Sequence, residues 1–315
     1  MKIIKVVYFT ENGKMTLQKL KEAEVQFIFE EKEADADLKQ WTKEAFEMHL
    51  PILFIGATGI AVRAIAPFVE SKLTDSPVLV MDELGKNVIP ILSGHFGGAN
   101  EIATEIAALA GANAIITTAT DINNVFAVDV FAKVNGLKIT DKDKIKIVSS
   151  KVLKGEKLKL TQTDDAIEID ELRLEPKRLV LGMGCKKDKP FEDLKAFLNE
   201  FYTDQELKDN LYAICSIDVK ERETGLIKLA QYYGAEFLTF SAEELKNAPG
   251  EYQESDFVNE TVGVGNVCER AAVLGAGKDS TLIKNKSAKN GMTFAEARRE
   301  KIDLKMERKW QDIFI

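Results

Sequence analysis

The sequence predicts an α/β fold with two three-layer domains whose sheets are mainly parallel, joined by a variable middle region. Strand-like apolar runs alternate with segments of helical spacing along most of the chain. These runs are short and almost wholly apolar, as strands buried in a parallel sheet are. The length of 315 residues suits about two domains. We expect the domains at residues 1–130 and 178–315, with the middle region at 131–177.

The expected N-terminal domain opens with a strand rich in β-branched residues. The run PILFI at 51–55 predicts a buried strand, because it is continuously apolar between turn signals. The apolar helix at 99–110 ends at Gly111, a residue type favoured just after a helix. The predicted strands are 2–10, 25–29, 51–55, 78–81, 87–92 and 114–118, and the predicted helices are 16–23, 37–48, 60–70 and 99–110.

Residues 135–178 are rich in Lys, Asp and Glu, and two interpretations stay open for them. They form either a solvated connector with a hairpin or a small subdomain, with a short β element at 144–148. In the C-terminal domain, Pro190 suits the first turn of a helix. The predicted strands there are 178–181, 211–217, 237–239, 261–264 and 282–284, and the predicted helices are 191–201, 225–233, 242–246 and 267–274.

Composition excludes several classes of protein. The 43 basic and 51 acidic residues give a net charge of −8, which argues against a dedicated nucleic-acid binder. No uninterrupted apolar run is long enough to span a membrane, and the first residues lack a signal pattern, so we expect a cytoplasmic protein. Three widely spaced cysteines and two histidines predict neither a disulfide framework nor a protein metal site.

The first candidate loop follows the strand at 51–55 and opens a helix. Gly56 and Gly59 would let the backbone approach a ligand that Thr58 also contacts, and helix N-terminal amides favour anions. Arg63, one turn into the helix, is long enough to bind a carboxylate. The alternative is a tight turn that binds nothing.

The second candidate loop is the richest, because three glycines surround a histidine just before a helix. His95 is a candidate general acid or base, and Glu101 a candidate for orienting its ring. Gly97 and Gly98 would expose successive amides as a cradle for an anion or oxyanion. The alternative is a histidine that only bonds its own loop. The loop also contributes Ser93, Gly94 and Asn100 to the predicted substrate contacts.

A third loop, containing Thr117, Thr118 and Asp121, would meet the first two at one sheet edge if all three strands are parallel. The C-terminal domain repeats the strand-to-glycine pattern before its own helices. Its predicted substrate contacts are Gly182, Gly184, Lys187, Gly265 and Asn266. Neither glycine run is a full dinucleotide fingerprint, and the P-loop pattern is absent. Cys185 lacks a neighbouring histidine in the sequence and is favoured as an inert thiol.

Several segments together resemble the cobalt-precorrin-5A hydrolase family of anaerobic cobalamin biosynthesis. In the N-terminal half these are FIGATGIAVRAIAP (54–67), LSGHFGGANE (92–101) and ITTATD (116–121). In the C-terminal half they are GMGC (182–185), SIDVK (216–220), TFSAEEL (239–245), VGNVCERAA (264–272) and MTFA (292–295). Residues 1–47 match only loosely, and 131–177 resemble nothing strongly.

The resemblance implies a reaction on a cobalt-containing tetrapyrrole. Water opens a δ-lactone of cobalt-precorrin-5A, and a two-carbon fragment leaves as acetaldehyde to give cobalt-precorrin-5B. The substrate carries the cobalt, so no cofactor is expected. His95 would be the general base, with Arg63, Thr58, Thr117 and Thr118 on the acetate and propionate groups. The second domain would close over the flat substrate.

Two other functions remain open at this point. The chain is alternatively a non-enzymatic carrier that hands a corrinoid intermediate to other pathway enzymes, or an α/β enzyme acting on a nucleotide or sugar phosphate. Neither nucleic acid nor membrane is expected as a partner. The sequence leaves open hand-off to other corrin-pathway enzymes and assembly into a homo-oligomer.

Overall fold

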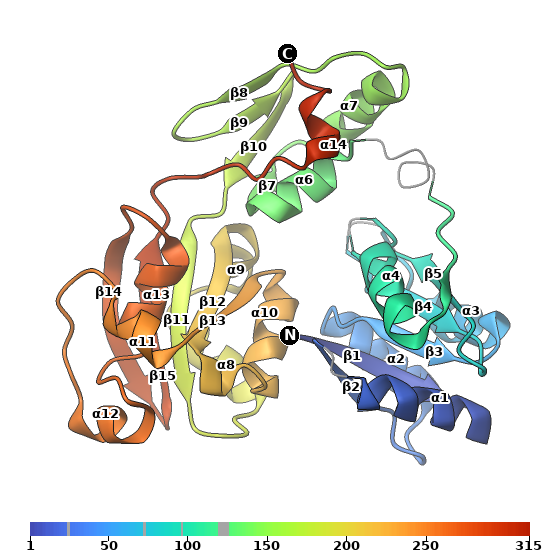
Figure 1. Cartoon of the computed structure of the whole chain (residues 1–315), viewed down its shortest axis with the longest axis horizontal. Helices are drawn as coiled ribbons and strands as arrows, with labels where there is room; N and C mark the ends of the chain where they lie inside the picture. The colour runs from blue at the N-terminus through green and yellow to red at the C-terminus, as the bar shows by residue number, and fades with distance from the viewer. Residues whose placement is uncertain (24–25, 72–73, 96, 119–125) are drawn as a thin grey trace. The chain divides into compact units, whose positions relative to one another are not determined.

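The computed structural model describes residues 1–23, 26–71, 74–95, 97–118 and 126–315 (Figure 1). The chain divides into two compact units, Met1–Val130 and Phe131–Ile315. The division falls inside α6 (Val128–Asn135). The first unit spans the predicted N-terminal domain, and the second combines the predicted middle region with the C-terminal domain.

The first unit is a sheet with the strand order β2-β1-β3-β4-β5-β6. All its pairings are parallel except that of β4 with β5. The strands are β1 (Lys2–Tyr8), β2 (Phe27–Glu31), β3 (Ile52–Ile55), β4 (Val78–Met81), β5 (Asn87–Leu92) and β6 (Asn113–Ala114). The helices are α1 (Glu11–Glu22), α2 (Leu38–Glu47), α3 (Thr58–Ile65) with the 3-10 turn η1 (Ala66–Phe68), and α4 (Ala99–Ala110).

Both faces of this sheet are covered, and the sequence of β3 shows why. Leu53 and Ile55 belong to the core formed with α1 and α4. Ile52 and Phe54 belong to the core formed with α2 and α3. Because successive strand residues point to opposite faces, a strand between two helical layers must be apolar at every position. The predicted three-layer α/β architecture is confirmed for this unit.

The expectation that the three candidate loops share one sheet edge is wrong. Only five residues, 82–86, join β4 to β5, whereas a parallel crossover needs about a dozen or more. The strands therefore form an antiparallel hairpin in which Leu92 pairs with Val78 and Val88 with Met81. The end of β5 then lies at the edge where β3 begins, opposite the edge where β3 ends.

Asp82 stabilises this hairpin. Its carboxylate accepts hydrogen bonds from the backbone amides of Leu84 (3.0 Å), Lys86 (3.1 Å) and Asn87 (2.6 Å). Burial acts to raise the pKa of Asp82, but the amide hydrogen bonds outweigh it and hold the pKa below its usual value. A lowered pKa in the folded state means that this stabilisation is present above about pH 4 and is lost as the pH falls through the folded-state value.

We expect Asp82→Ala to lower the free energy of unfolding by about 1–2 kcal/mol at pH 7. The gap between variant and wild type should shrink below about pH 4, because the wild-type carboxylate then becomes protonated. Urea unfolding of both proteins at pH 7 and at pH 3 measures both effects. A gap that is equal at the two pH values would contradict the assignment.

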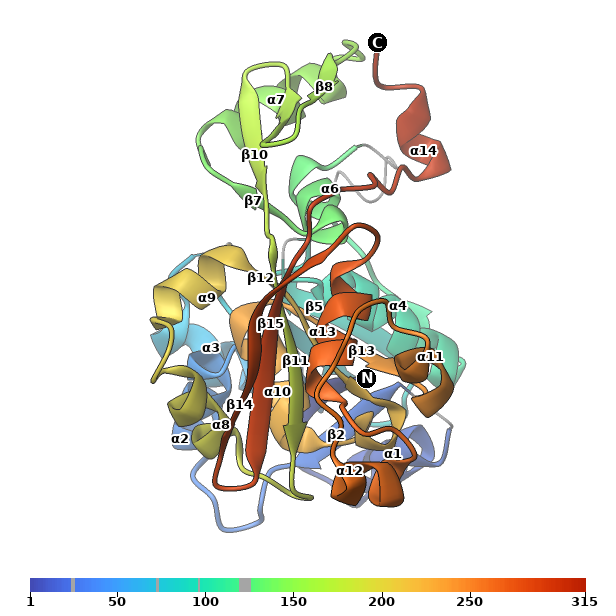
Figure 2. The same ribbon diagram turned by 90° about the vertical axis from the view of Figure 1, so that its left-hand side faces the viewer.

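The second unit contains a five-stranded sheet with the order β13-β12-β11-β15-β14. Figure 2 shows β15 (Met292–Arg298) between β14 (Thr281–Lys289) and β11 (Leu179–Cys185), antiparallel to both. β11, β12 (Leu211–Ile217) and β13 (Glu236–Phe240) are parallel. The parallel part of the sheet is thus extended by two antiparallel pairings of β15, a strand that the sequence analysis did not predict.

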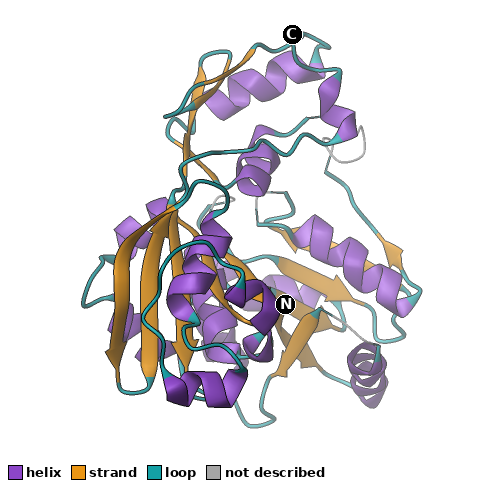
Figure 3. Cartoon of the chain, turned by 60° about the vertical axis from the view of Figure 1, so that its left-hand side comes forward, coloured by secondary structure: helices purple, strands orange, loops and turns teal. Residues whose placement is uncertain are grey.

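Helices cover both faces of this second sheet (Figure 3). α13 (Cys268–Ala276) packs on one face, against β11 and β12, and α10 (Thr224–Tyr233) packs on the other. The remaining helices are α8 (Phe191–Leu198), α9 (Asp204–Asn210), α11 (Ala242–Lys246) and α12 (Asp256–Val262), with the 3-10 turn η2 (Asp218–Lys220). The strand predicted at 261–264 is wrong, because α12 runs to Val262 and Gly263 ends it at φ 77°.

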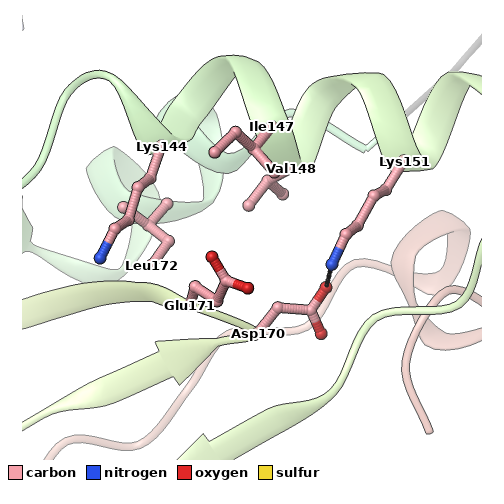
Figure 4. Close-up of a pocket in the computed structure, with 7 residues that line it drawn as sticks. All are labelled: Lys144, Ile147, Val148, Lys151, Asp170, Glu171 and Leu172. Atoms are coloured by element: carbon pink, nitrogen blue, oxygen red, sulfur yellow. Dashed lines mark hydrogen bonds and ion pairs between the residues drawn. The ribbon is translucent and has the colours of Figure 1, made fainter.

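The middle region forms a small subdomain rather than a solvated connector. Its antiparallel sheet has the order β7-β10-β9-β8 and packs with α7 (Lys144–Leu153), where the sequence predicted a β element. Lys151 of α7 pairs with Asp170 at 2.8 Å beside a small pocket (Figure 4). The strands are β7 (Leu137–Ile139), β8 (Leu160–Gln162), β9 (Ile167–Ile169) and β10 (Leu172–Pro176).

Residues 302–315 return to this subdomain and complete its core. Leu158 exchanges backbone hydrogen bonds with Ile313 and Ile315, each at 2.9 Å. Trp310, in α14 (Arg308–Gln311), is 1% exposed and lies edge-on to Phe131, with ring centroids 5.7 Å apart. The subdomain is therefore built from two segments that are distant in the sequence.

Candidate functional site

The backbone of the loop after β5 is closed by its own hydrogen bonds. The amides of Gly98, Ala99 and Asn100 donate to the carbonyls of His95 (3.2 Å), Ser93 (3.2 Å) and Gly94 (2.8 Å). The Ser93 hydroxyl donates to the carbonyl of Asp75 at 2.8 Å. The loop thus caps the first turn of α4 and is tied to the segment before β4, so the main chain around His95 is held on both sides.

Close approach explains two of the glycines in this loop. A Cβ on Gly94 would lie 2.6 Å from Oδ1 of Asn100, and one on Gly97 would lie 2.5 Å from Cβ of Ser93. The amide of Gly98 is engaged inside the loop, so it does not face an oxyanion as predicted. For Gly97 that role stays a prediction.

The His95 side chain lies beside a carboxylate that the sequence analysis missed. Nε2 of His95 is 3.3 Å from Oδ1 of Asp129, and the two side chains are 19% and 17% exposed. Burial acts to raise the pKa of Asp129, but His95 and the Val130 amide outweigh it and hold the pKa below its usual value. Asp129 is therefore ionised near neutral pH and places a negative charge next to the imidazole.

Glu101, the predicted orienting residue, has a different partner. Its carboxylate lies 3.4 Å from the Lys2 ammonium, and the Glu101 side chain is 59% exposed. Such an exposed pair contributes about 0–1 kcal/mol to stability. In the structure Asp129, and not Glu101, is the carboxylate placed to orient His95.

Asn100 joins the His95 loop to the third candidate loop. Its Nδ2 donates to the Thr118 hydroxyl at 3.1 Å, and the Asn100 residue is 8% exposed. Thr117 is exposed beside it. Asp121, the remaining residue predicted for this loop, lies outside the described residues. Two of the three candidate loops therefore do meet, at the edge of the sheet where β3 begins.

The first candidate loop lies at the opposite edge, after β3. Ala57 caps α3 without a side-chain hydrogen bond, and Thr58 and Gly59 are exposed at the helix start. The Arg63 guanidinium folds back over Gly59, since a Cβ there would lie 3.6 Å from Nη1. Gly56 comes just before this helix, against the ring of Phe9. These groups form an exposed cationic helix start, separated from His95 by the length of β3, roughly 13 Å.

Three of the predicted C-terminal contacts are buried and serve packing. A Cβ on Gly182 would lie 1.8 Å from the Cys268 carbonyl oxygen, so this glycine lets α13 approach β11. A Cβ on Gly265 would lie 1.8 Å from a Glu254 carboxylate oxygen. Asn266, 2% exposed, accepts from the Glu269 amide at 3.1 Å and so caps α13. Their role as substrate contacts stays a prediction.

Gly184 and Lys187 lie at the end of β11, where ligands often bind in α/β sheets. Lys187 is exposed. Nearby, Glu223 is 7% exposed, pairs with Lys220 at 2.7 Å and accepts the Lys189 amide at 3.2 Å. The Lys220–Glu223 ion pair is therefore largely buried, and through the Lys189 amide it ties the ends of β11 and β12 together.

Cys185, at the same strand end, is expected to be chemically inert. Burial raises the pKa of its thiol to about 11, against an ordinary value of 9.0. At a given pH this leaves about a hundredfold less of the reactive thiolate. We expect iodoacetamide at pH 8 to label Cys185 of the folded protein about a hundredfold more slowly than in urea, as followed by mass spectrometry. Equal rates in the two states would contradict this.

Among the described residues, no helix is long and apolar enough to span a membrane. The same residues contain no group of three or more His, Cys, Asp or Glu side chains placed to hold a metal ion. The candidate catalytic group is the pair of His95 and Asp129, at the edge of the sheet where β5 ends and α4 begins. It suits proton transfer to and from a bound substrate or water.

Two family models match the chain. The model described as Cobalamin synthesis G N-terminal matches residues 40–121, and the one described as Cobalamin synthesis G C-terminus matches residues 179–297. The first range contains both glycine-rich loops of the first unit. The second covers the five-stranded sheet with its helices, and the subdomain lies largely between the two ranges.

Curated relatives agree with these models. The cobalt-precorrin-5A hydrolase of Salmonella typhimurium is 35% identical over an alignment of 280 positions, which covers 76% of this chain and 80% of that protein. That of Priestia megaterium is 30% identical over an alignment of 289 positions, which covers 77% of each chain. A solved cobalamin biosynthesis protein G homolog from Sulfolobus solfataricus is 21% identical over 95% of this chain and 97% of its own, with a TM-score of 0.41. The chain belongs to the cobalamin synthesis G family.

Proposed function

We propose that this protein is a cobalt-precorrin-5A hydrolase, which opens the δ-lactone of its substrate, releases acetaldehyde and yields cobalt-precorrin-5B. The observation that carries this proposal is the similarity to proteins of that name over most of both chains. The cobalt is part of the substrate, so the reaction needs no resident cofactor. The poverty of histidine and cysteine ligands in the sequence fits that view.

The chemistry requires proton transfers that one histidine can supply. His95 removes a proton from water as the water adds to the lactone carbonyl. The acyl carbon–oxygen bond then breaks, which leaves a carboxylate and a hydroxyl group that receives the proton. Loss of the hydroxyl proton and cleavage of the neighbouring carbon–carbon bond release acetaldehyde, and the macrocycle keeps the electron pair. Asn100, Thr117 and Thr118 lie on the same edge as His95 and would hold the substrate there.

Binding must overcome charge repulsion, because the protein carries a net charge of −8 and the substrate carries several carboxylates. The net charge of the protein therefore does not attract the substrate over a long range, and hydrogen-bond donors and cations in the site have to supply the binding affinity. We propose Thr58, Gly59 and Arg63 at the start of α3, and Lys187 after β11, as such donors. We further propose a cytoplasmic protein that passes its product to other corrin-pathway enzymes.

The decisive experiment incubates the purified protein with cobalt-precorrin-5A. We expect loss of the two-carbon fragment by mass spectrometry, together with stoichiometric acetaldehyde. A non-enzymatic carrier would bind the tetrapyrrole and release no acetaldehyde. Tight binding of a nucleotide with indifference to the tetrapyrrole would instead indicate an enzyme of a different class.

A second experiment tests whether the substrate reaches the α3 edge. If Arg63 binds a peripheral carboxylate, Arg63→Ala should raise KM by about 10- to 100-fold with little change in kcat. Arg222→Ala, in the charged loop after β12, is the control for loss of one positive charge. An unchanged KM in Arg63→Ala would confine substrate binding to other parts of the chain.

A further inference from the structure

The carboxylate of Asp129 is held in place beside the His95 ring. Its Oδ1 accepts the Val130 amide at 2.9 Å and lies 3.3 Å from Nε2 of His95. Phe126 and Val128, which precede it, are each 1% exposed, so buried side chains anchor the backbone that carries Asp129. The carboxylate therefore has little freedom to leave the ring.

Backbone hydrogen bonds hold the main chain at His95, but they do not determine how the imidazole ring is oriented. Hydrogen bonds of the loop engage the backbone carbonyls of Ser93, Gly94 and His95, as described above. The orientation of the imidazole still depends on its two side-chain dihedral angles. A carboxylate at one ring nitrogen selects both the ring orientation and the neutral tautomer that carries its proton on that nitrogen.

The charge of Asp129 has a second consequence. A general base becomes a cation when it takes a proton, and an adjacent ionised carboxylate stabilises that cation. The stabilisation is larger where water is largely excluded, and both side chains are less than one-fifth exposed. Asp129 thus lies where it favours the state that His95 passes through during proton transfer.

We propose that Asp129 is a positioning residue for the hydrolase reaction, which orients the His95 imidazole, sets its tautomer and stabilises its protonated form. This inference rests on the proposed role of His95 as the general base. Asp129 lies at the start of α6, outside both glycine-rich loops. Asp129 acts through His95 and is not expected to contact the substrate.

The test compares Asp129→Asn, Asp129→Glu, His95→Gln and the double variant Asp129→Asn/His95→Gln. Asp143→Asn, an exposed aspartate at the start of α7, is the matched control. Acetaldehyde release gives kcat and KM for each protein. Nitrogen-15 NMR of the imidazoles reports the tautomer, and with two histidines in the chain the His95 signal is assigned by comparison with His49→Gln.

We expect Asp129→Asn to lower kcat by about 10- to 1,000-fold with KM within about threefold of wild type. Its His95 ring should lose its preference for the proton on Nε2. Asp129→Glu should recover part of kcat, because it restores the charge, and it serves as the test if the asparagine variant does not fold. In the His95→Gln background, Asp129→Asn should change the rate by less than about threefold, since it acts through the ring.

Full kcat in Asp129→Asn, an unchanged tautomer, or a loss that multiplies with that of His95→Gln would each overturn the proposal. Failure of the underlying function is recognised separately. Wild-type protein that releases no acetaldehyde refutes the hydrolase itself, and His95→Gln at full rate refutes the base assignment. Neither of these two results requires an Asp129 variant.

Discussion

Replacing His95 with glutamine is expected to lower the rate of acetaldehyde release by about 10²- to 10⁴-fold, the usual contribution of a positioned general base. Glutamine keeps the size and polarity of the side chain but does not take up a proton near neutral pH. Because the main chain of the loop is fixed by its own hydrogen bonds, the substitution should leave the fold intact. Single-turnover assays at saturating substrate measure the effect directly.

The other histidine offers a matched control. His49 lies in the turn before β3, where its Nδ1 is 3.1 Å from the Thr74 carbonyl oxygen. His49→Gln should keep kcat within about threefold of wild type, since the residue belongs to neither glycine-rich loop. If both variants lose activity equally, the loss reports damage to the fold and not removal of a base.

Gly182→Ala is expected to lower the free energy of unfolding of the second unit by at least about 3 kcal/mol, at the upper end of overpacking effects. The added Cβ would lie 1.8 Å from the Cys268 carbonyl oxygen and 2.6 Å from the Ala272 amide nitrogen. Both are backbone atoms of α13, which cannot rotate away as a side chain can. The helix must therefore shift on the sheet, and its buried contacts with β11 and β12 are disturbed.

Gly184→Ala is the control for this prediction, two residues along the same strand and on the same face. There the nearest atom to the new Cβ is the Thr293 hydroxyl oxygen at 2.8 Å, and a side chain can move aside. We expect a loss of less than about 1 kcal/mol. Denaturant unfolding of both variants measures the difference. Equal losses would show that the approach of α13 is not what requires Gly182.

The sequence was sufficient for the layers of the fold because burial on both faces leaves a strong local signal. Continuous apolar runs such as 51–55 predicted strands between two helical layers, and the structure has them. The antiparallel direction of β5 could also have been predicted, since the five residues between β4 and β5 are too few for a parallel crossover. The expectation of one shared edge assumes parallel strands. Because β5 is antiparallel to β4, the Arg63 loop and the His95 loop lie at opposite edges of the sheet.

Other features left no local signal. Asp129 reaches His95 from a position 34 residues later in the sequence, and pattern reasoning favoured Glu101 because it is near in the sequence. Gly182 was expected at the substrate, because a glycine that admits a ligand and one that admits a helix look alike in a sequence. The same ambiguity applies to Asn266, since a side chain that caps a helix and one that contacts a ligand look alike in a sequence.

The return of residues 302–315 to the subdomain bears on the order in which the protein folds as it is synthesised. Asn135 hydrogen-bonds both backbone groups of Lys305, 170 residues later in the sequence. At translation rates of about 5–20 residues per second, that partner emerges roughly ten to thirty seconds afterwards. In the first unit, paired strands lie closer together in the sequence, as when Lys5 of β1 pairs with Ile52 of β3.

During this interval Phe131 and Leu158 lack the chain that buries them in the finished protein. Exposed apolar surface on a partly folded chain attracts chaperones and favours aggregation. A translation product that stops before residue 302 should therefore contain a folded first unit and a subdomain that is incomplete and prone to aggregation. The segment at 302–315 therefore determines when the apolar core of the subdomain becomes protected from water.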